Sequence, residues 1–550
     1  MAGLRDRMTS TVIARGLGLP PARTHEVLRE DDVAIPMDDG VTLLADVYTP
    51  TGSAAVPTVL VRSPYGRKGI FGALQGRILA ERGFRSVLQS CRGTFGSGGT
   101  FEIAFAERAD GLATIRWIEA QPWFDGRLGM LGPSYLGYVQ WVVAAEAGPN
   151  LKAICPHTTT AHLAGHWYDS GSLTLDDAIN WSTLTATQEA QRWPLLEMLA
   201  NRWPRRVARV VDHLPLADLD VAVLEQRNAR WRSIIEHADD DDGYWQPADA
   251  TNDVARVTAA VDVVTGWYDL FLPMQLAEYR MLADAGRPPR MTIGPWTHVQ
   301  REMAACSMRE AISWLAEHLE LDGAQSTPQE ARVRVEIMGS GEWRDFTTWP
   351  PAGYAPQRWH LHPGRRLAPE EPAASSPSRY TYDPADPTPV RGGAILDVRR
   401  GGRRDQRAVE ERDDVLCFTS AVLDSDVEVV GDVEAQVHVE SDVDTFDVCV
   451  RVCEVDERGR SRNVTDGLVR VSSNERAQPV RLDLWPTAYR FRKGRRIRVQ
   501  VSSGAFPRYA RNLGTGEPIG SGTRMQQARM TIHHSPERPS SVALPVRVPA

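Results

Sequence analysis

Residues 127–149 constrain the fold more than any other part of the chain. They read RLGMLGPSYLGYVQWVVAAEAGP: a short apolar run ends at Gly132, Ser134 follows, and an apolar stretch of helical character comes next. This order predicts a strand, a sharp turn and a helix, an arrangement that holds the serine hydroxyl clear of the backbone. The glycine after the serine stands at Gly137, one residue later than in the pattern G-x-S-x-G. From this stretch alone, a serine that only caps a helix beginning at Tyr135 explains the pattern equally well.

Strand-like and helix-like segments alternate on both sides of this turn. Apolar runs bounded by turn residues predict strands, and several of them are apolar on both faces, which is typical of a parallel sheet covered by helices. An Asp-Asp-Gly turn at residues 38–40 predicts a hairpin at the start of the fold. The predicted hairpin covers residues 33–50, strands cover 57–63, 84–90 and 151–155, and helices cover 70–82 and 105–121. The alternation indicates an α/β domain.

The pattern changes twice along the remaining chain. Residues 157–247 carry helical segments without strand-like runs, which predicts a helical cap inserted over the end of the sheet. Strand, helix and strand then return at 259–265, 273–285 and 290–293. Beyond residue 324, short alternating runs such as 333–338, 427–439 and 446–455 predict a β-sandwich or barrel. We therefore predict a discontinuous α/β domain over 1–156 and 248–324, a cap over 157–247 and a β domain over 325–550.

Two polar residues after the cap complete a candidate for nucleophilic catalysis. A serine hydroxyl needs a histidine to accept its proton and an acid to orient that histidine. Asp269 follows the predicted strand 259–265, and His298 follows the strand 290–293. Alone, the aspartate is typical of a turn and the histidine of a surface loop. Together with Ser134 they occur in the order Ser, acid, His after strands whose carboxyl ends meet, which favours a catalytic triad.

Such a reaction also needs hydrogen-bond donors for the oxyanion that forms on the substrate. The backbone N–H of Tyr135, directly after the serine, is the first candidate. The loop after strand 57–63 contains no glycine run of the HGGG type, and it offers the hydroxyl of Tyr65 as the second donor. A role of Tyr65 as an aromatic anchor of the turn explains its position equally well.

Composition narrows the classes of function. The 550 residues carry a net charge of −8, which leaves no basic surface for nucleic acid, and no apolar run is long enough to span a membrane. The first 26 residues do not resemble a secretory signal, and the six cysteines are scattered, so we expect reduced thiols in a cytoplasmic protein. The glycine-rich segment 93–99 lacks dinucleotide-binding spacing, and no histidine pair has further metal ligands nearby. We expect neither a cofactor nor a catalytic metal.

Five motifs make the chain similar to a known family. They are SPYGR (63–67), CRGTFGSGGTF (91–101), the tryptophan-led stretch ending in GPSYLG (117–137), GWYD (266–269) and GPWTH (294–298). The chain resembles the bacterial cocaine-esterase-like serine hydrolases, which are related to X-prolyl dipeptidyl peptidases and α-amino-ester hydrolases. The late glycine of the turn is the form expected in that family, and the resemblance extends over nearly the whole chain.

The resemblance implies an α/β-hydrolase core, a helical cap and a C-terminal jelly-roll β domain. It also implies Ser134 as nucleophile, His298 as base and Asp269 as the acid that orients it. The hydroxyl of Tyr65 and the N–H of Tyr135 would form the oxyanion hole. By position, the aromatic side chains expected to line an acyl pocket are those of Trp181, Phe271 and Trp167, unless they are core aromatics between cap and sheet.

The residues after the acid help to choose among the family's activities. The α-amino-ester hydrolases resemble one another in an acidic cluster that binds a substrate ammonium group, part of which lies just after the triad aspartate. In this chain those positions hold Leu270, Phe271 and Leu272. An apolar wall would leave a cation without a partner, so we expect a small neutral ester with an aromatic or apolar acyl group. X-prolyl peptides, amides and α-amino esters remain alternatives. A degenerate hydrolase that only binds a ligand should lack a triad member, and none is missing. A homodimer is one assembly that the sequence leaves open.

Overall fold

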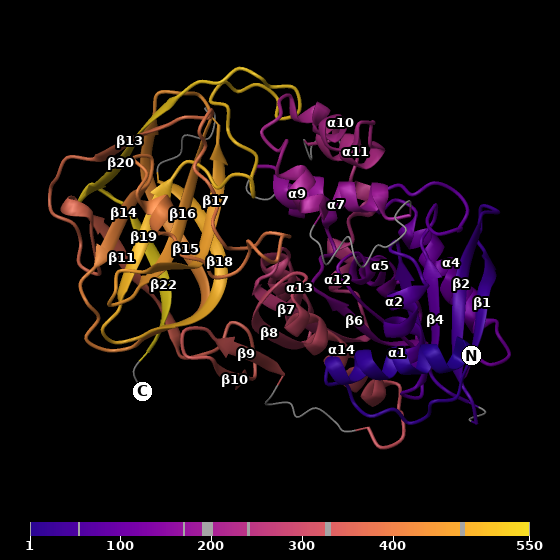
Figure 1. Cartoon of the computed structure of the whole chain (residues 1–550). Coiled ribbons are helices and arrows are strands. Elements are labelled where there is room, and N and C mark those ends of the chain that lie inside the picture. Colours follow the sequence, from indigo (N-terminus) through magenta and orange to yellow (C-terminus); the bar gives the residue numbers. More distant parts are fainter. Residues whose placement is uncertain are drawn as a thin grey trace.

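Two large β-sheets organise the molecule. The computed structural model describes residues 2–52, 55–168, 171–189, 202–238, 243–324, 332–472 and 479–548. One sheet has ten strands and the other has twelve. Figure 1 shows the strands of the C-terminal sheet gathered on one side of the molecule and the helix-covered N-terminal sheet on the other.

The ten-stranded sheet begins with an antiparallel hairpin and continues as parallel strands. Its order is β1-β2-β4-β3-β5-β6-β7-β8-β9-β10, and the neighbours from β4 to β9 pair in parallel. The strands are β1 (Val27–Pro36), β2 (Thr42–Pro50), β3 (Thr58–Ser63), β4 (Arg85–Ser90), β5 (Leu128–Pro133), β6 (Leu151–His157), β7 (Ala260–Tyr268), β8 (Arg290–Thr297), β9 (Val333–Ile337) and β10 (Glu342–Phe346). The α/β architecture predicted from the alternating pattern is confirmed, and so is the α/β-hydrolase core that the family resemblance implied.

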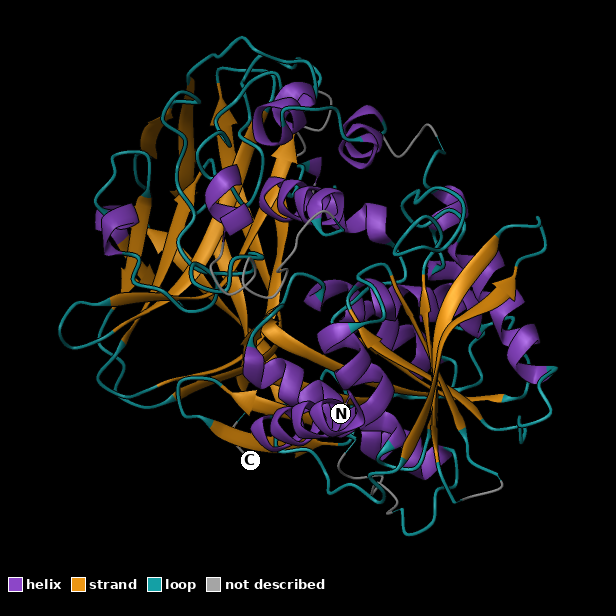
Figure 2. Cartoon of the chain, turned by 45° about the vertical axis from the view of Figure 1, so that its right-hand side comes forward, coloured by secondary structure: helices purple, strands orange, loops and turns teal. Residues whose placement is uncertain are grey.

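Helices cover both faces of this sheet, which explains why its central strands are apolar throughout (Figure 2). In β3, Val59 and Val61 belong to the buried cluster under α3 and α14, whereas Leu60 belongs to the cluster under α4 and α5. Successive side chains of a strand point to opposite faces, so one strand supplies both cores. The helices of the core are α1 (Ala2–Gly16), α2 (Gly69–Phe71), the π-helical η1 (Gly72–Arg77), α3 (Ile78–Ala80), α4 (Glu107–Glu119), α5 (Tyr135–Ala144), α13 (Leu272–Asp284) and α14 (Arg301–His318).

A group of helices between β6 and β7 forms the predicted cap. Figure 1 shows α7, α9, α10 and α11 together beyond the ends of the core strands. The cap helices are α6 (Leu163–Trp167), α7 (Leu175–Thr187), α9 (Arg202–Val207), η3 (Leu216–Asp218), α10 (Leu219–Leu224), α11 (Ala229–Glu236), η5 (Gln246–Ala248) and α12 (Thr251–Val254). Parts of the predicted cap at 169–170, 190–201 and 239–242 lie outside the described residues. Buried tryptophans such as Trp167 and Trp231 fill the space between these short helices.

The C-terminal part is rich in strands, as the short alternating runs predicted. The order of its sheet is β13-β20-β15-β22-β11-β12-β14-β19-β16-β17, with β18 paired to β15 and β21 to β20. Its elements are β11 (Tyr354–His362), η7 (Pro363–Arg365), β12 (Arg366–Ala368), β13 (Ser378–Tyr382), α15 (Arg407–Glu410), β14 (Leu416–Ser420), β15 (Val427–Ser441), β16 (Phe446–Val455), β17 (Ser461–Val471), β18 (Val480–Phe491), β19 (Arg496–Ser502), β20 (Ala528–Ser535), β21 (Arg538–Pro539) and β22 (Ser541–Arg547). The more specific jelly-roll topology stays a prediction.

The strand predicted at residues 333–338 belongs to the N-terminal sheet and not to the C-terminal β domain. The run 333–338 was expected in the C-terminal β domain, but β9 pairs in parallel with β8, and β10 then pairs with β9. Both strands therefore extend the N-terminal sheet. An alternating pattern shows that a strand has one buried face, but it does not show which sheet the strand joins.

None of the helices in the described ranges combines the length and the apolar character needed to cross a bilayer. The six cysteines are all free thiols in the structure, and five of them are buried.

Candidate active site

Ser134 lies on a sharp turn between β5 and α5, as its sequence neighbours predicted. Its backbone has φ 60° and ψ −130°, a conformation that residues with a side chain rarely adopt. Gly132 and Gly137 allow this turn. A Cβ atom at Gly132 would lie 2.4 Å from Cβ of Leu136, and one at Gly137 would lie 2.5 Å from Cγ2 of Thr159. The late glycine is therefore needed where α5 packs against the loop after β6.

The side chain of Ser134 does not cap the helix. Among the described residues, no amide of α5 donates to its hydroxyl. Its Oγ lies instead 3.0 Å from Nε2 of His298, whereas its backbone N–H donates to the carbonyl oxygen of His157 at 2.9 Å. The helix-cap interpretation of this serine is therefore wrong.

His298 and Asp269 reach the serine from the carboxyl ends of the neighbouring strands β8 and β7. Nδ1 of His298 lies 2.9 Å from Oδ2 of Asp269, and Oδ1 of Asp269 accepts from the N–H of Phe271 at 2.9 Å. Asp269 is fully buried, and His298 is 6% exposed. A carboxylate at Nδ1 favours the tautomer that carries its proton there, which leaves Nε2 free to accept a proton from the serine.

The hydroxyl of Tyr65 lies beside Ser134 and accepts a hydrogen bond from Nε1 of Trp181 at 3.0 Å. Because Trp181 is the donor, the proton of the tyrosine hydroxyl remains free for another acceptor. Burial raises the pKa of Tyr65 to about 12, although hydrogen bonds with Trp181 and Ser134 oppose the rise. The hydroxyl is thus a neutral donor at physiological pH. The ring also stacks near Phe71, with 6.1 Å between centroids, so it anchors the turn as well.

The backbone N–H of Tyr135 is the second candidate hydrogen-bond donor beside Ser134. It is the first amide of α5, where no preceding helical turn supplies an acceptor. The side chain of Tyr135 is held on the other side of the turn. Its hydroxyl donates to Oε1 of Glu107 at 2.9 Å and accepts from the N–H of Ala104 at 3.1 Å. These bonds fix the side chain of the residue that follows Ser134.

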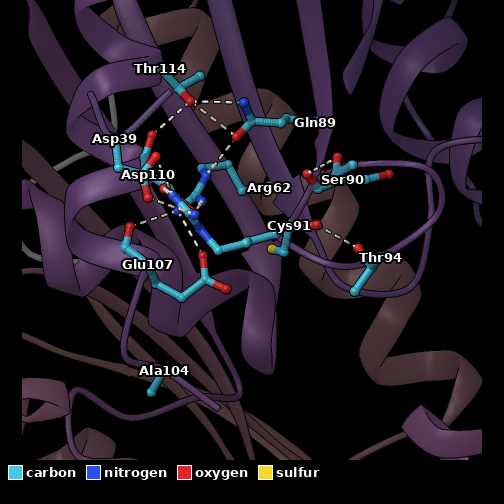
Figure 3. A network of polar contacts seen from close by, with 12 residues as sticks. Asp39, Arg62, Gln89, Ser90, Cys91, Thr94, Ala104, Glu107, Asp110 and Thr114 are labelled. Atoms are coloured by element: carbon cyan, nitrogen blue, oxygen red, sulfur yellow. Dashed lines mark hydrogen bonds and ion pairs between the residues drawn. The ribbon is translucent and has the colours of Figure 1, made fainter. Parts of the chain in front are cut away.

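A buried arginine, Arg62, lies in a network of polar side chains with Glu107 and Gln89 (Figure 3). Arg62 lies in β3, three residues before Tyr65, and is fully buried. Its Nη1 lies 2.9 Å from Oε2 of Glu107, and its Nε donates to Oε1 of Gln89 at 2.8 Å. Burial alone would lower the pKa of Arg62, but the neighbouring carboxylates hold the pKa above its ordinary value. Glu107 thus links β3 to Tyr135 through one carboxylate.

A pocket opens beside Ser134 and His298. The three aromatic residues predicted for it, Trp181, Phe271 and Trp167, all lie along its wall. The ring of Trp181 stacks on that of Tyr135 at 6.0 Å and lies 6.1 Å from that of Trp167. Trp181 is only partly buried, so it is not simply a core residue between cap and sheet.

Five further residues line this pocket, and of these only Leu270 was expected, as part of the apolar wall after Asp269. They are Leu163, His166, Asp177, Leu270 and Leu396. His166 and Asp177 come from α6 and α7 of the cap, and an acidic residue in the first turn of a helix ordinarily indicates only a favourable helix end. Leu396 comes from a loop in the C-terminal part, far along the chain. Its neighbours in the sequence carry no signal of a pocket.

Cys155, His157 and Asp262 form a buried group with the composition of a metal site. Their polar atoms have other partners. His157 bonds Oγ of Ser307 through Nδ1 at 2.7 Å and Oδ2 of Asp262 through Nε2 at 3.1 Å, and Nε of Arg290 donates to Oδ1 of Asp262 at 2.8 Å. A metal ion here would have to displace a buried arginine, so these residues fit a structural ion-pair network better than a metal. The absence of a catalytic metal stays a prediction.

Comparisons with known proteins agree with this arrangement. Residues 39–300 match the family described as X-Pro dipeptidyl-peptidase (S15 family), and residues 326–543 match its C-terminal non-catalytic domain. Cocaine esterase from Rhodococcus sp. (strain MB1 Bresler) is 32% identical, over 94% of this chain and 98% of its own length. A solved α-amino acid ester hydrolase superposes with a TM-score of 0.80 at 22% identity, covering 95% of this chain and 97% of its own. An aminopeptidase from a marine sediment archaeon of the Thaumarchaeota has a TM-score of 0.78 at 22% identity, covering 95% and 96%.

Proposed function

This chain belongs to the cocaine-esterase-like serine hydrolases related to the X-Pro dipeptidyl peptidases, and from that premise we propose that it hydrolyses neutral carboxylic esters through an acyl-enzyme on Ser134. The observation that carries the proposal is the hydrogen-bonded series of Asp269, His298 and Ser134 at the mouth of an aromatic pocket. Each of these residues has the side chain that its role in acyl transfer requires.

In the first half of the reaction, Oγ of Ser134 attacks the ester carbonyl carbon while Nε2 of His298 takes the hydroxyl proton. The carboxylate of Asp269 stabilises the imidazolium that results. When the tetrahedral intermediate collapses, the imidazolium gives its proton to the leaving alkoxide. The alcohol departs, and the acyl group remains on Ser134.

Two donors stabilise the negative charge that develops on the carbonyl oxygen. These are the hydroxyl of Tyr65, which its raised pKa keeps protonated, and the backbone N–H of Tyr135. Donors fixed before the reaction need no reorganisation when the charge appears. The bonds of Trp181 to Tyr65 and of Glu107 to Tyr135 supply this fixation.

In the second half, a water molecule takes the place of the alcohol. His298 accepts a proton from the water as it attacks the acyl carbon, and the same two donors hold the second oxyanion. Collapse of this intermediate returns the proton to Oγ of Ser134 and releases a carboxylic acid. The free enzyme is restored.

Replacing Tyr65 with phenylalanine is expected to lower kcat by about 10²- to 10³-fold, because the loss of one oxyanion donor has that effect in acyl-transfer enzymes. KM should change little, since the hydroxyl contributes most when charge has developed on the oxygen. Steady-state hydrolysis of 4-nitrophenyl butyrate measures both constants. Tyr380→Phe is the matched control, because it removes a buried tyrosine hydroxyl that bonds Ser503 in the C-terminal part. Equal losses in the two variants would contradict a role of Tyr65 in stabilising the oxyanion.

The residues around the pocket favour an aromatic or apolar acyl group. Leu270 and Phe271 contribute to its wall beside Trp167 and Trp181, and Leu272 is buried at the start of α13. Aromatic and aliphatic walls stabilise a ligand by removing apolar area from water. An ammonium group would lose its hydration there without an unpaired carboxylate beside the scissile bond.

A panel of chromogenic substrates tests the proposed function. The purified protein is assayed with 4-nitrophenyl benzoate and butyrate, with an α-amino acid 4-nitrophenyl ester, and with an X-Pro 4-nitroanilide. We expect the two neutral esters to have the highest kcat/KM. Activity confined to the amino-bearing substrates would contradict the neutral-ester assignment and favour an amino-ester hydrolase or peptidase. Failure to turn over any substrate would favour a binding protein.

A further inference from the structure

Two polar residues of the cap lie in the wall of the pocket and take no part in the proposed triad. His166 ends α6 and Asp177 stands in the first turn of α7, and Nε2 of the histidine lies 2.5 Å from Oδ2 of the aspartate. His166 is 4% exposed and Asp177 is 7% exposed. Both residues line the pocket that contains Ser134. They also line a second, small cavity together with Leu270, Thr174 and Arg508.

The orientation of this His166–Asp177 pair is fixed by its neighbours. The imidazole ring of His166 lies 4.4 Å from the ring of Phe271, which in turn meets the ring of His298 edge-on at 5.4 Å. The backbone carbonyl of His166 accepts a hydrogen bond from Oγ1 of Thr174 at 3.2 Å. Phe271 therefore contacts both the pair and His298.

His166 and Asp177 each have one polar side-chain atom that their mutual hydrogen bond does not use. In the ranges that the structure describes, neither Nδ1 of His166 nor Oδ1 of Asp177 has a hydrogen-bond partner. Both residues line the pocket, so the two atoms are open to a ligand that enters it. A ligand in the pocket is the natural source of the missing partner.

The chemistry of the two atoms selects the ligand group. Oδ1 of Asp177 only accepts a hydrogen bond, whereas Nδ1 of His166 accepts when the ring is neutral and donates when it is protonated. A hydroxyl group can donate to Oδ1 while it accepts from a protonated Nδ1, and when the ring is neutral it can donate to one of the two atoms. An ammonium group only donates, and a carboxylate only accepts.

The neighbouring charges also favour a neutral group. Among the described residues that line the pocket, Asp177 is the one carboxylate, and His166 already occupies one of its oxygens. Asp176, behind it in α7, faces Nη1 of Arg400 at 3.7 Å, and Asp397 lies near Asp176. A buried cation in the pocket would therefore share its counter-ion with an imidazole, and its desolvation would be poorly compensated.

We propose that the His166–Asp177 pair determines specificity, and that the preferred esters carry a hydroxyl group at the far end of the aromatic acyl group. This proposal rests on the proposed function, since it requires the acyl group to occupy the pocket beside Ser134. A site built to bond a hydroxyl group discriminates against the analogue that lacks it, because the polar atoms of the site are then left unpaired.

Matched 4-nitrophenyl esters test the proposal. The first set contains phenylacetate and 3-phenylpropanoate, the second set their 4-hydroxyphenyl analogues, and the third set their 4-(aminomethyl)phenyl analogues. The measured quantity is the ratio of kcat/KM for each substituted ester to that of its parent. For the wild type, we expect a hydroxyl ratio of about tenfold or more in at least one length series. The aminomethyl ratio should stay below the hydroxyl ratio.

Two variants attribute the preference to the pair. In Asp177→Leu and in His166→Phe, the hydroxyl ratio should fall to about one. Each variant is compared with its own parent ester, so a general loss of activity cancels from the ratio. His318→Gln is the matched control: it changes a largely buried histidine at the end of α14, outside the pocket, and should keep the wild-type ratio.

The outcomes separate this proposal from the function on which it rests. A hydroxyl ratio near one in the wild type, with the parent esters hydrolysed, would overturn the specificity proposal and leave the esterase intact. A ratio that survives both variants, or an aminomethyl ratio above the hydroxyl ratio, would overturn it as well. If no ester is hydrolysed, the proposed function fails, and the specificity proposal fails with it. Because the wild-type ratio decides by itself, variants that do not fold leave the test intact.

Discussion

Replacing Ser134 with alanine is expected to reduce kcat for 4-nitrophenyl esters by at least about 10⁴-fold, to within the residual catalysis that binding and the oxyanion donors supply. In the proposed mechanism the hydroxyl of Ser134 forms the acyl-enzyme, and its Oγ lies 3.0 Å from Nε2 of His298. Without it, His298 can only activate water directly. Release of nitrophenolate at substrate concentrations above KM, with background hydrolysis subtracted, measures the loss.

The matched control for this prediction is Ser182→Ala. Ser182 is a buried serine in α7, next to the pocket residue Trp181, and its hydroxyl has no hydrogen-bond partner among the described residues. We expect this variant to keep nearly full activity. If Ser134→Ala retained more than about a hundredth of wild-type kcat, acyl transfer through Ser134 would be wrong.

Asp269→Asn is expected to lower kcat by about 10⁴-fold with a smaller change in KM, as the same exchange does in other serine hydrolases. The carboxylate holds the proton of His298 on Nδ1, at 2.9 Å, and stabilises the imidazolium during the transfer. An amide can donate to Nδ1 instead, and the ring then carries its proton on Nε2, where it faces Ser134 and cannot act as a base.

The comparison for Asp269→Asn is Asp249→Asn, which alters a carboxylate whose bonds reach only the nearby Thr251. Equal thermal midpoints for Asp269→Asn and the wild type would show that the loss is catalytic rather than structural. If Asp269→Asn kept kcat within about tenfold of the wild type, another acid would have to orient His298.

The sequence predicted the core of the site because its signals are local. Ser134, Asp269 and His298 each follow a buried strand, and parallel strands end at the same edge of a sheet, so their order along the chain was enough to place them together. The strain of the turn was also visible, since Gly132 and Gly137 mark the two places where a Cβ atom would collide.

The parts that were not predicted depend on tertiary contacts. His166 and Asp177 are ordinary residues of short cap helices until α6 and α7 bring them within hydrogen-bond distance. Leu396 enters the pocket from the C-terminal part, and β9 could have joined either sheet. Helix α1, in a leader without a clear pattern, is fixed to the core by the bond from Oγ of Ser10 to Oε1 of Glu81. Local periodicity does not contain such long-range partners.

The central claim is that Ser134 is the nucleophile, and covalent trapping tests it most directly. The purified protein is treated with diethyl 4-nitrophenyl phosphate, so that a serine activated by His298 displaces nitrophenolate and keeps a diethylphosphoryl group that water removes slowly. Mass spectrometry of the intact chain and of its peptides then counts and locates the label. We predict one label per chain, on Ser134, one equivalent of nitrophenolate, parallel loss of esterase activity, and no label in Ser134→Ala. A label on another residue, or loss of activity without a label on Ser134, would contradict the account.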